Sequence, residues 1–119
     1  KQAASNKDLT VNGDGTQTRS FCYIDDLVNG IIQLMISEYS YPINIGNDDE
    51  VTINEIASTL ISILNSQSKV IYNDLPEDDP LKRKPDLTLA KKILNWAPKI
   101  DKKDGFEMLI EYYKKNNLI

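Results

Sequence analysis

Three prolines within one short stretch constrain this chain more than any other feature of its sequence. They are Pro76, Pro80 and Pro85, in the run PEDDPLKRKPD. Each proline lacks an amide N–H and has a fixed φ, so this run is incompatible with a regular helix or a central strand. We therefore predict a stiff, irregular loop over residues 74–86. The loop also carries Arg83, the only arginine in the last hundred residues of the chain.

The spacing of apolar residues in the rest of the chain predicts about four helices and four or five very short strands. We expect helices over residues 25–37, 53–64, 87–94 and 105–117, strands over 9–11, 19–24, 41–47 and 69–73, and the end of a further helix over 1–8. This is an α/β arrangement with too few strands for a complete doubly wound sheet. No linker divides the chain, so we interpret residues 1–119 as a single unit.

Short polar and acidic side chains stand where these helices would begin. The candidates are Asp25 or Asp26, the capping box of Thr52 with Glu55, Asp86, and Asp101 with Asp104. Three pairs of adjacent aspartates, at 25–26, 48–49 and 78–79, lack the spacing of a calcium loop. We interpret them as caps and turn residues, and we predict no metal site.

Composition excludes several classes of function. A net charge of −4 argues against binding to a nucleic-acid backbone. The chain has no histidine, the usual general base at neutral pH, and its single Cys22 cannot form an internal disulfide. We expect Cys22 to be a packed thiol and Trp96 a core aromatic. With no apolar run long enough to span a membrane and no signal-peptide pattern, we expect a cytoplasmic protein.

Two features could carry binding chemistry. The first is GDGTQTRSFCY over residues 13–23, in which Gly13 and Gly15 permit close backbone approach while Gln17 and Arg19 supply donors. A β-turn between two strands explains the same residues. The segment has no third glycine and no following helix, so it is not a dinucleotide fingerprint.

The second feature is the placement of the two arginines, Arg19 and Arg83, in turn-rich segments of a chain whose other basic residues are lysines. A guanidinium can bind a diphosphate or a carboxylate through two parallel hydrogen bonds, which lysine does less well. Alternatively, each arginine makes a surface ion pair that contributes little.

Three segments together resemble a known enzyme family. They are GDGTQTRSFCYIDDLVNGIIQLM, PINIGNDDEVTINEIA and LPEDDPLKRKPDLTLAKKILNWAPK. In this order and spacing they resemble the C-terminal part of the UDP-glucuronate decarboxylases (UDP-xylose synthases), extended short-chain dehydrogenases/reductases of the NAD-dependent epimerase/dehydratase family. The segment around LPEDDP and Arg83 is the most discriminating of the three.

The resemblance implies a small substrate-binding lobe that closes over a nucleotide sugar against an NAD-binding Rossmann lobe. In that family NAD⁺ oxidises the C4 hydroxyl of UDP-glucuronate, the keto acid loses carbon dioxide, and NADH then reduces the ketone to give UDP-xylose. The resemblance implies that Arg83 clamps the diphosphate and that Arg19 faces the diphosphate or the sugar carboxylate. Gln17, Gly13 and Gly15 would shape the wall of the pocket.

The chain departs from the family in three ways. It has neither the glycine-rich GxxGxxG nor the catalytic YxxxK. We therefore expect it to carry no catalytic residue and to bind no NAD by itself. We interpret it as a fragment of a larger two-lobe enzyme that is inactive alone. It also has Asn12 where relatives usually have tyrosine, which weakens the preference for uridine.

Two other functions fit the same sequence. The chain could be the lobe of another nucleotide-sugar enzyme, of the dTDP-glucose dehydratase or epimerase type. It could also be a non-catalytic interaction module that keeps the fold and offers the apolar faces of helices 25–37 and 106–117 to a partner. A lobe without its Rossmann partner leaves apolar surface uncovered, so we also expect self-association.

Overall fold

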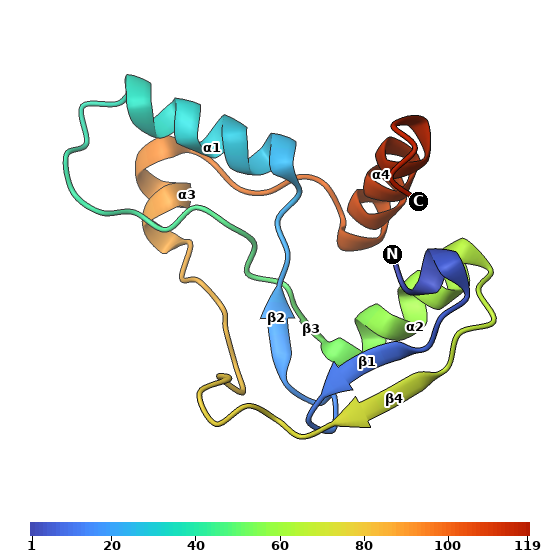
Figure 1. Ribbon diagram of the computed structural model, residues 1–119. Helices are drawn as coiled ribbons and strands as arrows, with labels where there is room; N and C mark the ends of the chain where they lie inside the picture. The colour runs from blue at the N-terminus through green and yellow to red at the C-terminus, as the bar shows by residue number, and fades with distance from the viewer.

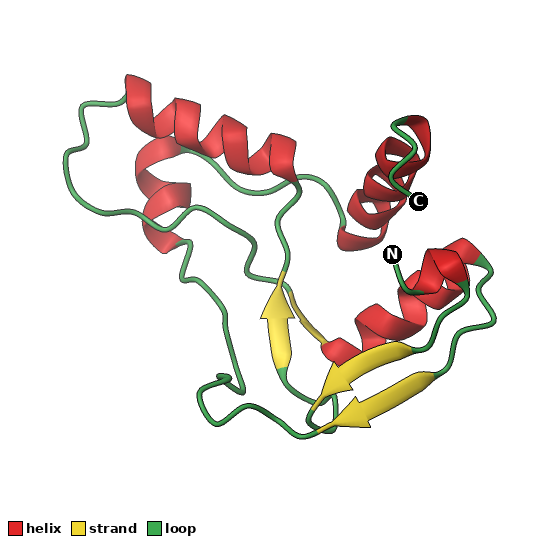
Figure 2. Cartoon of the chain, viewed as in Figure 1, coloured by secondary structure: helices red, strands yellow, loops and turns green.

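Four α-helices and four short strands follow one another in the computed structural model, which describes residues 1–119 (Figure 1, Figure 2). In chain order they are the 3-10 turn η1 (Ala3–Ser5), β1 (Leu9–Asn12), β2 (Thr18–Ser20), α1 (Ile24–Ile36), β3 (Glu50–Thr52), α2 (Ile53–Leu64), β4 (Val70–Asn73), α3 (Thr88–Leu94) and α4 (Lys102–Lys115). The predicted α/β class, with about four helices, short strands and no complete Rossmann sheet, is confirmed.

The strands form two separate pairs. β1 runs parallel to β4, with Leu9 opposite Val70, and β2 runs antiparallel to β3, with Arg19 opposite Val51. In Figure 1 the β1–β4 pair lies beneath α2, while β2 and β3 lead from it towards α1 and α3. The β2–β3 pair therefore connects the two halves of the molecule.

Two of the predicted helix starts are confirmed. Thr52 and Glu55 form the capping box of α2, and Asp101 caps α4 by accepting a 2.8 Å hydrogen bond from the amide of Lys103. At α3 the cap position is Leu87, and Asp86 lies one residue earlier, where its carboxylate accepts from the amide of Thr88 at 2.8 Å. Asp86 therefore forms a turn that leads into the helix.

The predicted cap of α1 is wrong. Tyr23 is the residue that precedes the helix, and Asp25 and Asp26 lie in its first turn, where carboxylates interact favourably with the helix dipole. The carboxylate of Asp26 is buried and accepts hydrogen bonds from the amides of Lys99 and Ile100, at 2.9 and 2.8 Å. Asp26 therefore fastens α1 to the segment that precedes α4.

Some predicted strands are shorter than expected or absent. Residues 41–47 form no strand, because no neighbouring strand pairs with them, and the strand begins only at Glu50. The predicted strand over residues 19–24 is limited to β2, since its partner β3 is only three residues long. Residues 1–8 contain the single 3-10 turn of η1.

The apolar core consists of two small clusters. One packs Ala3, Leu9 and Ala57 between η1, β1 and α2. The other packs Leu87, Ala90 and Trp96 against the half-buried Cys22, so the packed thiol and the core tryptophan are both observed.

The molecule is open for its length. Only 17 of its 119 residues are buried, and its radius of gyration is 16.5 Å, against about 13.5 Å for a compact domain of this size. Large apolar side chains are consequently exposed on the outer face of α1: Ile24, Val28, Ile31, Ile32, Met35 and Ile36. None of the helices is long and apolar enough to cross a membrane.

Candidate anion-binding site on the proline loop

The proline-rich loop runs along one edge of β2, and β3 occupies the other. The carbonyl of Gln17, just before β2, accepts from the amide of Ile53 on the β3 side at 3.1 Å. The carbonyl of Gln17 and the amide of Thr18 belong to one peptide unit, and in an extended chain these two groups point to opposite edges of the strand. The amide of Thr18 therefore points to the loop, where it donates to the carbonyl of Leu81 at 2.9 Å. The loop is thereby attached to the sheet although its prolines prevent regular pairing.

The side chain of Arg19 also attaches β2 to the loop. Its guanidinium is paired with the carboxylate of Asp79 and also donates to the carbonyls of Pro80, at 2.7 Å, and Thr18, at 2.8 Å. The Arg19 side chain is only 19% exposed. In this structure, the hydrogen-bonding capacity of Arg19 is thus largely directed at the loop.

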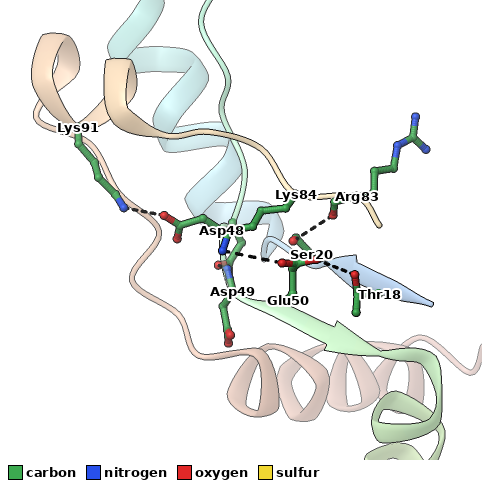
Figure 3. A network of polar contacts seen from close by, with 9 residues as sticks. Thr18, Ser20, Asp48, Asp49, Glu50, Arg83, Lys84 and Lys91 are labelled. Atoms are coloured by element: carbon green, nitrogen blue, oxygen red, sulfur yellow. Dashed lines mark hydrogen bonds and ion pairs between the residues drawn. The ribbon is translucent and has the colours of Figure 1, made fainter. Parts of the chain in front are cut away.

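Arg83 is held differently. The hydroxyl of Ser20 donates to its backbone carbonyl at 3.2 Å, whereas its guanidinium makes no hydrogen bond or ion pair within the chain. Figure 3 shows this side chain extending away from the polar network around Ser20, Glu50 and Lys84. The main chain of Arg83 is therefore attached to β2, and its charged group is available to a ligand.

Both arginines line one shallow, polar surface pocket. The lining residues are Arg19, Ser20, Asn44, Arg83, Lys84, Pro85 and Asp86. The pocket has three cationic side chains and one carboxylate, that of Asp86. Hydrogen bonds from Thr88 hold the pKa of Asp86 below its ordinary value. Lys84 is only weakly engaged, with its Nζ 3.9 Å from a carboxylate oxygen of Glu50. Because Arg19 is paired with Asp79, the positive charge that remains for an anionic ligand comes from Arg83 and Lys84.

The two glycines predicted as site residues lie in the turn between β1 and β2, outside this pocket. Gly13 and Gly15 both have positive φ, +70° and +76°, which favours glycine. The amide of Gly13 donates to the carbonyl of Asn73, and the carbonyl of Gly15 accepts from the amide of Asn54. This turn therefore joins β1, β4 and the start of α2.

Gln17, the remaining predicted site residue, is buried. Its side-chain amide donates to the carbonyl of Asn12 at 2.5 Å, which closes the turn that carries the two glycines. The structure thus brings Arg19 and Arg83 into one pocket. It places Gln17 with Gly13 and Gly15 at the turn that leads into β2.

A second group of charged residues connects the segment before β3 with two helices. Asp48 pairs with Lys91 of α3 at 2.7 Å, as Figure 3 shows, and Asp49 pairs with Lys102 of α4 at 2.8 Å. These pairs lower the pKa of Asp48 and raise the pKa of Lys102. The aspartates predicted as turn residues therefore also tie the two helices to the sheet.

The chain offers little for nucleophilic or metal chemistry. Burial, followed by the charge of Asp26, raises the pKa of the Cys22 thiol, which keeps it protonated and weakly nucleophilic at neutral pH. No group of three or more acidic or cysteine side chains could hold a metal ion. Gly13 and Gly15 lie in a turn between two strands and not in a strand-to-helix turn, so they do not form the phosphate-binding loop of a Rossmann-type NAD site.

Sequence comparisons show what the chain is similar to. Residues 1–46 match the model of the "NAD dependent epimerase/dehydratase family". Over 113 residues, 95% of its length, the chain is 42% identical to UDP-glucuronic acid decarboxylase 5 of Arabidopsis thaliana, and it covers 33% of that relative. The chain thus spans about a third of the length of this relative.

Comparison with solved structures also finds similar proteins. The fold superimposes on a UDP-glucose 4-epimerase of Thermotoga maritima, solved with UDP-glucose, with a TM-score of 0.92 and 27% identity over 98% of this chain and 38% of the other. It also superimposes on a UDP-glucuronic acid 4-epimerase of Bacillus cereus, solved with UDP-glucuronic acid and NAD, with a TM-score of 0.88 and 30% identity over 97% of this chain and 38% of the other.

The architecture is therefore an α/β part of a short-chain dehydrogenase/reductase-type epimerase fold. The resemblance identified from the sequence is confirmed. Along nearly its whole length the chain is similar to UDP-glucuronic acid decarboxylases, and its first 46 residues match the epimerase/dehydratase family.

Proposed function

We propose that this chain is the nucleotide-sugar-binding lobe of an NAD-dependent enzyme of the UDP-glucuronate decarboxylase type. The observation that carries the proposal is the guanidinium of Arg83, which is unpaired and exposed beside Lys84 on a loop attached to β2. Because the main chain of Arg83 is attached to β2, only its side chain has to be ordered when the guanidinium binds a diphosphate.

In this proposal Arg83 binds the diphosphate of a UDP-sugar through two parallel hydrogen bonds, and Lys84 adds a point charge. Arg19 closes the inner wall of the pocket, where it meets phosphate or carboxylate oxygens. Gln17, Gly13 and Gly15 shape the site through the turn that leads into β2. The carboxylate of Asp86 also lines the pocket, and it disfavours an anion next to it.

NAD supplies hydride transfer in the complete enzyme, and the residues of this chain bind and orient the sugar. The chain contains no YxxxK, so we propose that it binds without turnover when alone. Its single thiol and lack of disulfides suit a cytoplasmic setting.

The preference for the nucleotide base is a separate part of the proposal. Asn12 ends β1, its side chain is exposed, and its carbonyl is occupied by Gln17. An asparagine offers no aromatic surface for the base to stack on. We therefore propose that this lobe recognises the diphosphate more strongly than the uracil.

Calorimetric titration with UDP, UMP, uridine, UDP-glucuronate and dTDP tests this function. If the diphosphate dominates recognition, UDP and dTDP should bind with similar affinity, UMP more weakly, and uridine not measurably. Equal binding of uridine and UDP would overturn the proposal. Tighter binding of UDP-glucuronate than of UDP would indicate a contribution from the sugar carboxylate.

An epimerase lobe is the second candidate, because the solved structures that superimpose well on this chain include epimerases of UDP-glucose and UDP-glucuronic acid. The product of the completed enzyme distinguishes the two: UDP-xylose with release of carbon dioxide for a decarboxylase, or a C4 epimer without it. A non-catalytic interaction module remains the candidate from another class, favoured by the exposed apolar face of α1.

A further inference from the structure

Three successive residues of β2 each donate a hydrogen bond to the proline loop. The donors are the backbone amide of Thr18, the guanidinium of Arg19 and the hydroxyl of Ser20, and the acceptors are the carbonyls of Leu81, Pro80 and Arg83. The loop thus contributes acceptors only along this edge. Pro80 and Pro85 have no amide N–H, so at these two positions the loop can only accept.

Asp79 adds the only side chain of the loop that bonds to β2. Its carboxylate pairs with the guanidinium of Arg19, 60 residues earlier in the chain, and both side chains are partly buried, at 29% and 19% exposure. A charged pair with this little exposure is screened less than an ordinary surface pair. Arg19 therefore bonds to two successive loop residues, Asp79 and Pro80.

This arrangement fixes where Arg83 lies. Asp79 and Arg83 are the two ends of one short, proline-containing segment, and both ends are bonded to neighbouring residues of β2. If the carboxylate of Asp79 were released, the segment would keep only the hydrogen bonds that Thr18, Arg19 and Ser20 donate to its backbone carbonyls. Arg19 would also lose the charged partner that orients its guanidinium towards the loop, so we expect the segment and Arg83 to be held less firmly at the pocket.

We propose that Asp79 is a positioning residue for Arg83: by pairing with Arg19 it docks the segment 79–83 on β2 and so places the Arg83 guanidinium at the pocket. This inference rests on the proposed function, because the docked loop is taken to serve anion binding. The docking itself can be tested without a ligand.

The test uses Asp79→Asn, with Asp78→Asn as the matched control, because Asp78 is exposed and makes no hydrogen bond or ion pair within the chain. The first measurement is hydrogen exchange of the Thr18 amide, whose acceptor is the carbonyl of Leu81. We expect Asp79→Asn to speed this exchange roughly tenfold or more, as loss of a charge-assisted bond implies. Asp78→Asn and the conservative Asp79→Glu should stay close to wild type.

The amide of Leu9, which donates to the carbonyl of Lys69 in the other strand pair, reports on the fold as a whole. If Thr18 and Leu9 both exchange faster in Asp79→Asn, the variant has lost general stability, and the claim of specific docking is overturned. Unchanged exchange at Thr18 overturns it as well.

The second measurement is UDP binding in a double-mutant cycle with Arg83→Lys. Positioning predicts that Asp79→Asn weakens UDP binding several-fold when Arg83 is present and hardly at all in the Arg83→Lys background. Equal losses in both backgrounds would overturn the positioning role. If the wild-type chain does not bind UDP, the proposed function fails for this chain, while the exchange measurement still decides whether Asp79 docks the loop.

Discussion

The buried carboxylate of Asp26 accepts a 2.8 Å hydrogen bond from the backbone amide of Ile100, 74 residues later in the chain. Together with the bond from Lys99, it joins the start of α1 to the segment before α4. We expect Asp26→Asn to lower the free energy of unfolding by about 1–3 kcal/mol, because one acceptor oxygen and the charge are lost. Urea denaturation measures this, and Asp25→Asn, at an exposed position of the same helical turn, should change stability by less than about 0.5 kcal/mol.

The turn between β1 and β2 depends on Gly15. Its φ is +76°, and a Cβ at this position would overlap the side chain of Asn54. We therefore expect Gly15→Ala to destabilise the chain by more than about 1 kcal/mol. Gly46→Ala is the matched control, since Gly46 does not have positive φ and a Cβ there would meet only the Pro85 ring, at 3.3 Å. A melting temperature for Gly15→Ala equal to that of Gly46→Ala would contradict this account of the turn.

The ion pair of Asp48 and Lys91 makes stability depend on acid pH. Lys91 lowers the folded-state pKa of Asp48 below the ordinary value of 3.8, so the pair contributes stability above that pH. This contribution is lost as the pH falls through the lowered pKa. We expect Lys91→Met to raise the pKa of Asp48, as followed by NMR titration of its carboxyl carbon, whereas Lys92→Met should leave it near the wild-type value.

The exposed face of α1 should drive self-association. Met35 and Ile36 are 77% and 72% exposed at the end of a helix that also exposes Ile31 and Ile32. We expect the average mass by light scattering to rise with concentration for the wild type and to rise much less for Met35→Glu. Asn29→Glu adds the same charge on α1 without removing an apolar side chain, and it should associate like the wild type. A monomeric wild type at all concentrations would disprove the expectation.

Local sequence signals predicted the parts of the fold that depend on local chemistry. The capping box at Thr52 and the cap at Asp101 use side chains within three residues of the helix start, so they could be identified from spacing alone. The strand expected over residues 41–47 could not be corrected in this way, because a strand also needs a partner, and no local signal shows that none is present.

The same distinction between local and long-range signals applies to the candidate site. The prolines identified the loop, and the rarity of arginine drew attention to Arg19 and Arg83. The partner of Arg19 was missed, because Asp79 lies 60 residues away and belongs to an acidic pair that also suits a turn. The role of Asp26 was missed for the same reason: its bonds go to the backbone of residues 99–100 rather than to its own helix.

The central claim is that Arg83 binds a diphosphate through its planar guanidinium. The most direct measurement is calorimetric titration of UDP into the wild type, Arg83→Lys and Lys82→Met. Arg83→Lys keeps the charge and loses the two-point geometry, so we expect it to weaken binding by about 1–3 kcal/mol. Lys82→Met removes a neighbouring charge and should weaken binding by less than about 1 kcal/mol. UDP binding by Arg83→Lys that equals the wild type, or a larger loss for Lys82→Met than for Arg83→Lys, would contradict the claim.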